Sequence, residues 1–254
     1  ELAADELASR TVGSRALADG LRKIHGEAAA YPAYWSNEVA PVLGAGFRPP
    51  LATGFARFLA CAGVARAVSE KVEQELKEGR ADAYDTHPAL RERLLAIEKL
   101  PTGATPDRDP PAITLVENLD EMETRLLAHL ADEAQARALK PVDWGDVGRD
   151  VYLPMWQGAV NEQADALAGL TPAALPELVK DPAPLAARLR DPKGVTLAPE
   201  ERARRALWVL AVALTQALKR NGWELHVAPG EETLLVRGQS VSYTHLTLPT
   251  NREV

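Results

Sequence analysis

The fold class is already visible in residues 1–24, which read ELAADELASRTVGSRALADGLRKI. Apolar side chains recur there at steps of three to five residues, among Ala, Arg and Glu: Leu2, Leu7, Val12, Leu17, Leu21 and Ile24. This spacing places the apolar groups on one side of an amphipathic helix, so it predicts a helical start to the chain. Either Gly13 or Gly20 is expected to divide this stretch into two helices, and the pattern does not choose between them.

Helical patterns continue along most of the remaining chain. We expect a short helix that starts at Tyr31 and stops within 44–50, and further helices over 50–77, 89–100, 120–138, 147–170 and 199–219. Residues 223–227 and 233–237 alternate apolar and polar side chains around Pro229-Gly230, which is typical of a β-hairpin. The sequence therefore predicts a mainly α fold in which an α-rich region ends in a β-hairpin.

Composition also suggests where the chain divides. Residues 101–110 are rich in Gly, Pro and charged side chains, which is typical of a linker between a region over 1–100 and a second region over 111–238. Residues 239–254 follow with a different composition, since Ala does not occur after Ala228. The stretch 241–250 resembles the translated read-through of a sequencing-library adapter, and a natural polar tail is the alternative. We therefore expect 239–254 to be an artefactual tail without a functional role.

The charge balance excludes some classes of partner. The formal net charge is −7, and no block of Lys and Arg interleaved with aromatic residues occurs, so we expect no nucleic-acid partner. The longest apolar stretch, 55–68, is interrupted by Arg57 and Arg66, and it falls short of the ~20 residues that span a bilayer. The chain itself is soluble in composition. It begins without Met, already inside a helical pattern, and we expect it to be a fragment of a longer protein.

Two carboxylates stand at the start of the first predicted helix. Glu1 and Asp5 are four residues apart, so their side chains project from the same face of a helix. One carboxylate can ligate zinc, and a second one nearby can accept a hydrogen bond from a ligating histidine. The alternative is surface charge at the positive end of a helix dipole.

A second segment whose side chains could take part in catalysis is His87-Pro88-Ala89-Leu90-Arg91-Glu92-Arg93. His87 precedes a Pro that is well suited to the first turn of a helix, and Arg93 follows further along that helix. A His held in this way can reach into a cleft, and an Arg there can hold a carbonyl or carboxylate of a substrate. The alternative is a capping His with a surface Arg.

Together these two segments resemble the zinc metallopeptidases typified by the CAAX prenyl endopeptidase and the HtpX-like membrane peptidases. In that family an HExxH helix supplies two histidine ligands and a general-base glutamate. An ExxxD motif supplies the third ligand, and an HPxxxxR segment follows. Glu1-Leu2-Ala3-Ala4-Asp5 matches the second motif, and His87-Pro88 with Arg93 matches the third. The resemblance covers residues 1–100, which it makes the C-terminal helical part of a metallopeptidase domain.

The resemblance assigns a role to each of these residues. Glu1 would be the zinc ligand, and Asp5 would support the metal site as a catalytic residue. His87 and Arg93 would be active-site residues that contact the substrate, the product or the open position of the metal. The intact protein would cleave a polypeptide substrate with a zinc-activated water. Upstream segments would place it in a membrane, which the resemblance implies to be the bacterial cytoplasmic membrane.

This sequence departs from the family in one large respect. It contains no HExxH, and no two of its histidines are four residues apart: His25, His87, His129, His226 and His245. We therefore expect the chain by itself to be inactive. The alternative function, from another class, is a non-enzymatic helical protein-interaction domain with coincidental motif matches.

Overall fold

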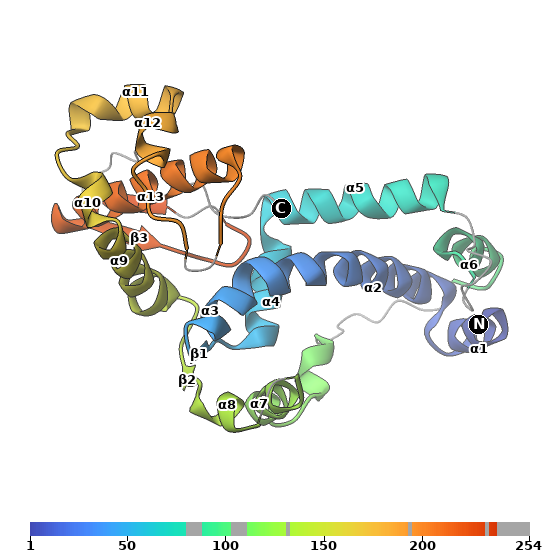
Figure 1. Cartoon of the computed structure of the whole chain (residues 1–254). Coiled ribbons are helices and arrows are strands. Elements are labelled where there is room, and N and C mark those ends of the chain that lie inside the picture. Colours follow the sequence, from blue (N-terminus) through green and yellow to red (C-terminus); the bar gives the residue numbers. More distant parts are fainter. Residues whose placement is uncertain (80–87, 103–110, 131–132, 193–194, 232–233, 238–254) are drawn as a thin grey trace. The chain divides into compact units, whose positions relative to one another are not determined.

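The structure is a computed structural model that describes residues 1–79, 88–102, 111–130, 133–192, 195–231 and 234–237. Helices make up most of these residues, and their strands pair in two-stranded sheets (Figure 1). The predicted mainly α fold is confirmed. No single helix among the described residues is long and apolar enough to cross a membrane. The helices α4 (Leu51–Ala60) and α5 (Ala62–Glu78) reach the required length and composition only as a pair, which is bent by 80°.

Contacts between residues group the chain into two compact units. Unit 1 comprises residues 1–38 and 51–137, and unit 2 comprises residues 39–50 and 138–254. These units do not follow the boundary that the sequence suggested at 101–110, because unit 1 extends to residue 137 and unit 2 includes residues 39–50. Residues 103–110 and 238–254 lie outside the described part of the chain, so the linker and the artefactual tail stay predictions.

Helices make up most of the described residues of unit 1. They are α1 (Leu2–Val12), α2 (Ser14–Tyr34), α4 (Leu51–Ala60), α5 (Ala62–Glu78), α6 (Leu90–Ile97), the 3-10 turn η2 (Ala112–Leu115), α7 (Leu119–Leu130) and α8 (Glu133–Ala138). Figure 1 shows α5 running alongside α2, and α6 packs against α1, α2 and α5. The π-helical segment η1 (Trp35–Val39) and α3 (Ala40–Gly44) continue from α2 into unit 2.

Gly13, and not Gly20, divides the first helical stretch. Gly13 has φ 86°, a left-handed conformation that glycine adopts without steric cost, and Gly20 lies inside α2. The Ser14 N–H then donates to the Pro101 carbonyl at 3.0 Å, which ties the start of α2 to the chain after α6. The position of this break therefore lets α1 fold back against α2.

The separate helix expected from Tyr31 is wrong, because α2 continues through Pro32 to Tyr34. Tyr34 is 1% exposed, its hydroxyl donates to the Leu51 carbonyl at 2.8 Å, and its ring lies 5.5 Å from that of Phe58. Burial raises the pKa of the Tyr34 hydroxyl, so it stays a protonated donor. This anchored aromatic side chain explains why the helix extends past the proline.

The single long helix expected over 50–77 is also wrong, since the chain bends by 80° between α4 and α5. Phe58 is buried in α4, and Val64 is the first half-buried valine of α5. In a straight helix these two positions would lie about 120° apart around the axis. The extended backbone of Cys61, with ψ 129°, breaks the helix, so that both apolar faces can pack against α2.

The core beside α6 is formed by an apolar stripe on this helix, which lies within the range 89–100 that the sequence predicted. Leu90, Leu94 and Ile97 are at most 4% exposed and pack with Ala18 and Leu21 of α2. Burial of each such aliphatic side chain contributes about 1.5–3 kcal/mol. The stripe fixes α6 on α2 and so determines which way Arg93 of α6 can point.

A buried carboxylate joins α7 to the start of α4. Glu123 of α7 is 7% exposed, and its two oxygens accept the backbone N–H groups of Leu51 at 2.9 Å and Ala52 at 2.7 Å. The first N–H groups of a helix have no partner within the helix, so this distant side chain serves as the cap of α4.

Helices also make up most of the described residues of unit 2: the π-helical η3 (Gly148–Tyr152), α9 (Leu153–Glu162), α10 (Ala164–Leu167), the 3-10 turn η4 (Pro172–Ala174), α11 (Leu175–Lys180), α12 (Ala183–Ala186) and α13 (Pro199–Arg220). Its strands are the parallel pair β1 (Phe47–Arg48) and β2 (Lys140–Pro141), followed by β3 (Trp223–His226) and β4 (Leu234–Arg237). Helix α13 supplies core residues to two clusters, one with α10 and α12 and the other with α9. The predicted helix over 199–219 is confirmed.

The predicted β-hairpin is confirmed as well. β3 and β4 are antiparallel, and Trp223 pairs with Arg237 while His226 pairs with Leu234. Gly222, between α13 and β3, has φ 81°, a conformation that L side chains rarely adopt. This glycine allows the chain to leave α13 and enter the hairpin.

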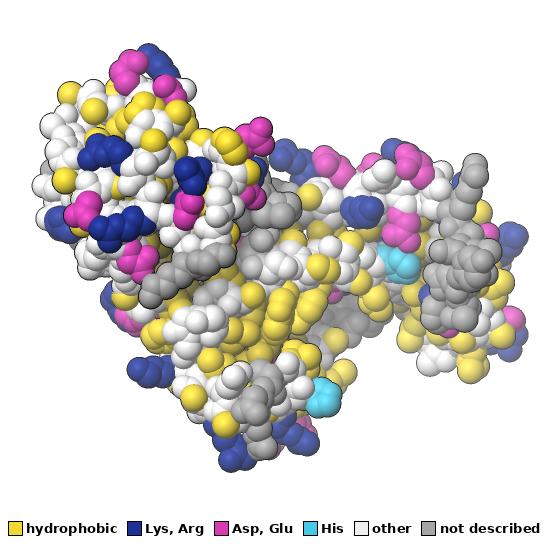
Figure 2. Space-filling model, viewed as in Figure 1, with side chains coloured by type: hydrophobic (Ala, Val, Ile, Leu, Met, Phe, Trp, Pro, Cys, Tyr) yellow, Lys and Arg dark blue, Asp and Glu magenta, His cyan; other side chains and the backbone are white. Residues whose placement is uncertain are grey.

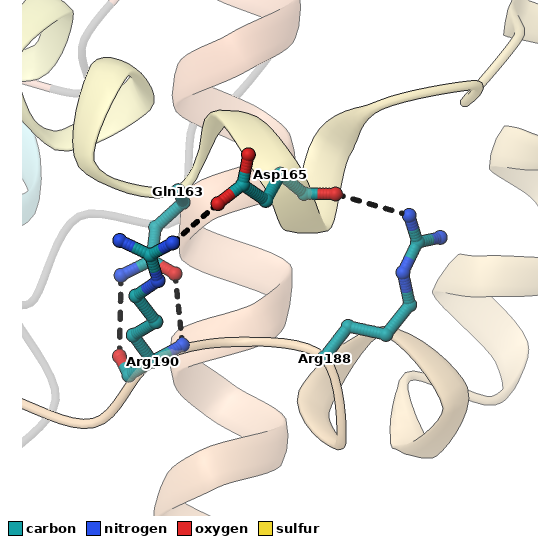
Figure 3. Close-up of polar contacts among 4 residues, drawn as sticks. All are labelled: Gln163, Asp165, Arg188 and Arg190. Atoms are coloured by element: carbon teal, nitrogen blue, oxygen red, sulfur yellow. Dashed lines mark hydrogen bonds and ion pairs between the residues drawn. The ribbon is translucent and has the colours of Figure 1, made fainter.

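A polar latch closes the loop after α12 onto α10 (Figure 3). The Gln163 side chain is nearly buried, donates to the Arg190 carbonyl at 3.1 Å and accepts the Arg190 N–H at 2.9 Å. The Arg190 guanidinium pairs with Asp165, and Arg188 donates to the carbonyls of Asp165 and Ala168. The Arg188 bonds satisfy carbonyls of α10 and its C-cap, and the Gln163 bonds satisfy the backbone of Arg190 in the loop, so the role of these contacts is structural.

Candidate functional site

The structure brings the two sequence motifs of unit 1 together through one ion pair. Asp5 lies in α1, Arg93 lies in α6, and 88 residues separate them. Arg93 Nε donates to Asp5 Oδ2 at 2.9 Å, and Arg93 Nη2 donates to Asp5 Oδ1 at 2.7 Å. Two parallel N–H···O bonds of this kind fix the relative orientation of both side chains. The pair therefore locks the start of α1 onto α6.

Both side chains of this ion pair are largely buried, so each charge depends on the other for stabilisation. The Asp5 side chain is 5% exposed and the Arg93 side chain is 15% exposed. The hydrogen bonds from Arg93, and secondarily its positive charge, hold the pKa of the Asp5 carboxyl below its usual value, against the opposing effect of desolvation. The hydrogen bonds to Asp5 raise the pKa of the Arg93 guanidinium in return. Both groups are therefore charged at neutral pH.

Glu1 completes a three-residue group that we call the Glu1–Asp5–Arg93 cluster. Its carboxylate oxygen Oε2 lies 3.4 Å from Arg93 Nη2, and its side chain is 34% exposed. The Glu1 carbonyl accepts the Asp5 N–H at 2.9 Å, so the two carboxylates stand one helical turn apart as predicted. Arg93 thus lies against both carboxylates, with Asp5 on the buried side and Glu1 nearer to solvent.

The cluster can supply only part of a zinc site. Among the residues that the structure describes, no three His, Cys, Asp or Glu side chains are grouped closely enough to hold a metal ion. Both Asp5 oxygens already accept hydrogen bonds from Arg93, so Glu1 is the better placed metal ligand of the two. A catalytic zinc needs three protein ligands. The described residues alone do not fit that requirement.

His87 lies outside the described residues, so its predicted role at the site stays a prediction. The structure describes the chain again from Pro88, and the Arg93 N–H donates to the Ala89 carbonyl in the first turn of α6 at 3.1 Å. Arg93 is thus held by its own helix as well as by Asp5.

The sequence does not show that Asp5 and Arg93 pair with each other, because the 88 residues between them leave their spatial relation to the packing of α6. It also missed Ser9, which lies on the same face of α1 one turn after Asp5. Ser9 is 3% exposed, and its hydroxyl oxygen has no hydrogen-bond partner in the described part of the chain. The spacing of residues 1, 5 and 9 along one helix face was the available signal.

A second polar contact of unit 1 joins α2 to α5. His25 Nδ1 lies 3.1 Å from Glu75 Oε1, and both side chains are about one-third exposed. This contact between two helices gives His25 a structural role.

On the face shown in Figure 2, Lys and Arg side chains are interspersed with Asp and Glu. Such mixing leaves no extended single-sign patch on that face. No protein-family model, curated protein or solved structure matches this chain.

Proposed function

We propose that the chain is the C-terminal part of a zinc-dependent metalloendopeptidase, which hydrolyses peptide bonds of a polypeptide substrate. The observation that carries the proposal is the two-bond ion pair between Asp5 and Arg93. It joins two motifs that the resemblance associates with one active site although 88 residues separate them. A coincidental match gives no reason for these particular side chains to meet in a buried position.

Within this proposal the residues of the cluster have distinct tasks. Glu1 is the metal ligand that this chain contributes. Asp5 and Arg93 are positioning residues, since their pairing fixes the first turn of α1 and so the direction of the Glu1 side chain. Bound zinc would supply an activated water and polarise the scissile carbonyl.

The remaining ligands and the general base would come from an HExxH segment outside this sequence, because the 254 residues contain none. The proposal also carries the family's membrane location, through segments upstream of Glu1. The intact protein would then be a membrane peptidase, and the present chain by itself would be inactive.

The test uses the complete reading frame of the gene. We expect an HExxH segment upstream of Glu1 and about one bound zinc per molecule, and Glu1→Gln should release the metal and abolish peptide hydrolysis. Glu6→Gln is the matched control, since Glu6 lies on α1 as well but pairs with Arg10 at the exposed surface. Equal zinc content in the two variants, or a reading frame without HExxH, would overturn the proposal.

A second candidate function is a helical protein-interaction domain. The observation that favours it is an apolar stripe on α7, where Met122, Leu126 and Leu130 are 52%, 44% and 59% exposed at four-residue spacing. Leu115, just before α7, is 81% exposed. Spacing of this kind is typical of a helix that packs against a partner. If the complete protein binds no zinc and Leu126→Glu abolishes an oligomer or complex, this function replaces the first.

A further inference from the structure

An apolar pocket of about 220 Å³ lies within unit 1, away from the Glu1–Asp5–Arg93 cluster. Helix α2 contributes Ala29, Ala30 and Ala33 to its wall, and α5 contributes Val64, Ala67 and Val68. Phe58 of α4 and Lys71 of α5 complete the lining. Pockets of this kind, between helices and mostly apolar, are common places for small ligands.

The geometry of the helices explains the hollow. At Gly26, α2 and α5 approach so closely that a Cβ atom would lie 2.6 Å from Val68 Cγ1 and 3.2 Å from Val72 Cγ2. Past that contact the facing side chains of α2 are alanines, which are too short to fill the space between the helices. The 80° bend between α4 and α5 then turns the chain away and places Phe58 as a wall.

The pocket is open to the surface. Ala29 and Ala33 on one side and Ala67 on the other are exposed, whereas Ala30 and Phe58 are buried. Small exposed residues at the rim leave a path for a ligand to enter. Covering the apolar wall with an alkyl group would remove that surface from water, which is favourable by roughly 25 cal/mol per Å².

One charge stands at this apolar pocket. Lys71 has the single polar side chain of the lining, is exposed, and has no ion pair with a described residue. The nearby Glu75, one turn further along α5, is engaged by His25. Because the whole chain carries a net charge of −7, attraction of an anion has to come from a local cation such as this one.

We propose that this pocket binds an alkyl carboxylate, with its chain among the alanine and valine side chains and its carboxylate at Lys71. A peptide is the poorer occupant, because its amide groups would meet a wall without polar side chains other than Lys71. An alkyl carboxylate has its only polar group at one end, where the lysine lies. This site does not depend on the peptidase function.

The test is titration of the whole chain with decanoate below its micelle concentration, followed by calorimetry and by the NMR signals of the Val64 and Val68 methyl groups. Decanol and decyltrimethylammonium are the neutral and cationic probes of equal chain length. Decanoate should bind most tightly, and decyltrimethylammonium most weakly. Lys71→Met should weaken decanoate about two- to fivefold, as expected for an exposed ion pair, and leave decanol unchanged.

Two variants fill the pocket from opposite walls. Ala67→Leu on α5 and Ala33→Leu on α2 each add a side chain at an exposed rim position, so at least one should fold and lose decanoate binding. Lys77→Met is the matched control, because Lys77 lies on α5 outside the pocket and pairs with Glu73. Absent decanoate binding, equal binding of the cationic probe, or unchanged binding in a folded filling variant would overturn the proposal.

Discussion

In unit 1, Arg93 binds Asp5 through two hydrogen bonds of 2.9 and 2.7 Å, and in unit 2, Arg149 binds Asp150 through two of 2.6 and 2.8 Å. In both pairs, hydrogen bonds from the arginine are the first cause that lowers the pKa of the aspartate. The local chemistry of the two pairs is thus nearly identical.

Their surroundings differ in two respects. The first pair joins side chains 88 residues apart that are 15% and 5% exposed, whereas the second joins sequence neighbours that are 66% and 39% exposed. An exposed pair exchanges hydrogen bonds with water and contributes little, whereas breaking a buried pair leaves an uncompensated charge. We infer that only the Asp5–Arg93 pair holds parts of the chain together.

The largest effect is expected from removing one partner of the buried pair. Arg93→Met should lower the free energy of unfolding by about 3 kcal/mol, because Asp5 is left charged and buried. Arg149→Met should leave it unchanged within error. Urea denaturation of the whole chain, followed by circular dichroism, compares the two variants. Equal effects would show that burial does not distinguish the pairs.

Acid should distinguish the two pairs next. Because folding lowers the pKa of Asp5, its contribution to stability is complete above the unfolded value of about 3.9 and is lost as pH falls through the lower folded value. Asp5→Asn should therefore remove part of the loss of stability that the wild type shows below about pH 4. Asp150→Asn is the control on the exposed pair. The measurement is the urea midpoint from pH 7 to pH 2.

A smaller loss of stability is expected at Glu123, the buried carboxylate of α7. This residue tests whether burial also matters for a carboxylate that binds backbone N–H groups instead of an arginine. Glu123→Gln keeps one acceptor for the N–H groups of Leu51 and Ala52, and it should cost about 1 kcal/mol. Glu121→Gln is the matched control, because Glu121 is exposed on the same helix. Thermal unfolding of both variants measures the difference in stability between them. A larger loss for Glu121→Gln would contradict the assigned cap.

The smallest effect is expected at an exposed ion pair between residues far apart in the sequence. This pair tests whether burial or sequence separation determines the contribution to stability. Arg190 and Asp165 are 25 residues apart, yet their side chains are 70% and 82% exposed (Figure 3). If burial decides, Arg190→Met should change the free energy of unfolding by at most about 0.5 kcal/mol. A loss as large as that of Arg93→Met would mean that linking distant segments matters more than burial. The same urea denaturation measures both variants.

Regular elements with a complete apolar stripe could be predicted from the sequence. The helix that carries Leu90, Leu94 and Ile97 and the hairpin after α13 were both expected, because each depends on local spacing. The bend at Cys61 could not be predicted, since the residues on both sides favour helix. It arises from the need of both α4 and α5 to face α2.

The candidate site shows the same division. The spacing of Glu1 and Asp5 correctly placed them one turn apart, but nothing in it identifies which of 29 basic residues would pair with Asp5. That choice depends on how α6 packs, which places Arg93 opposite α1. The resemblance named both residues and still left their contact unstated.

The same long-range contacts set a schedule for biosynthesis. A ribosome that adds about 5–20 residues per second needs roughly 4–18 seconds to advance from Asp5 to Arg93. Throughout that interval the Asp5 carboxylate lacks the guanidinium that binds it in the folded chain, so the ion pair between α1 and α6 cannot yet form. Helix α1 is therefore synthesised early within unit 1, but its ion pair with α6 can form only after Arg93 has been added.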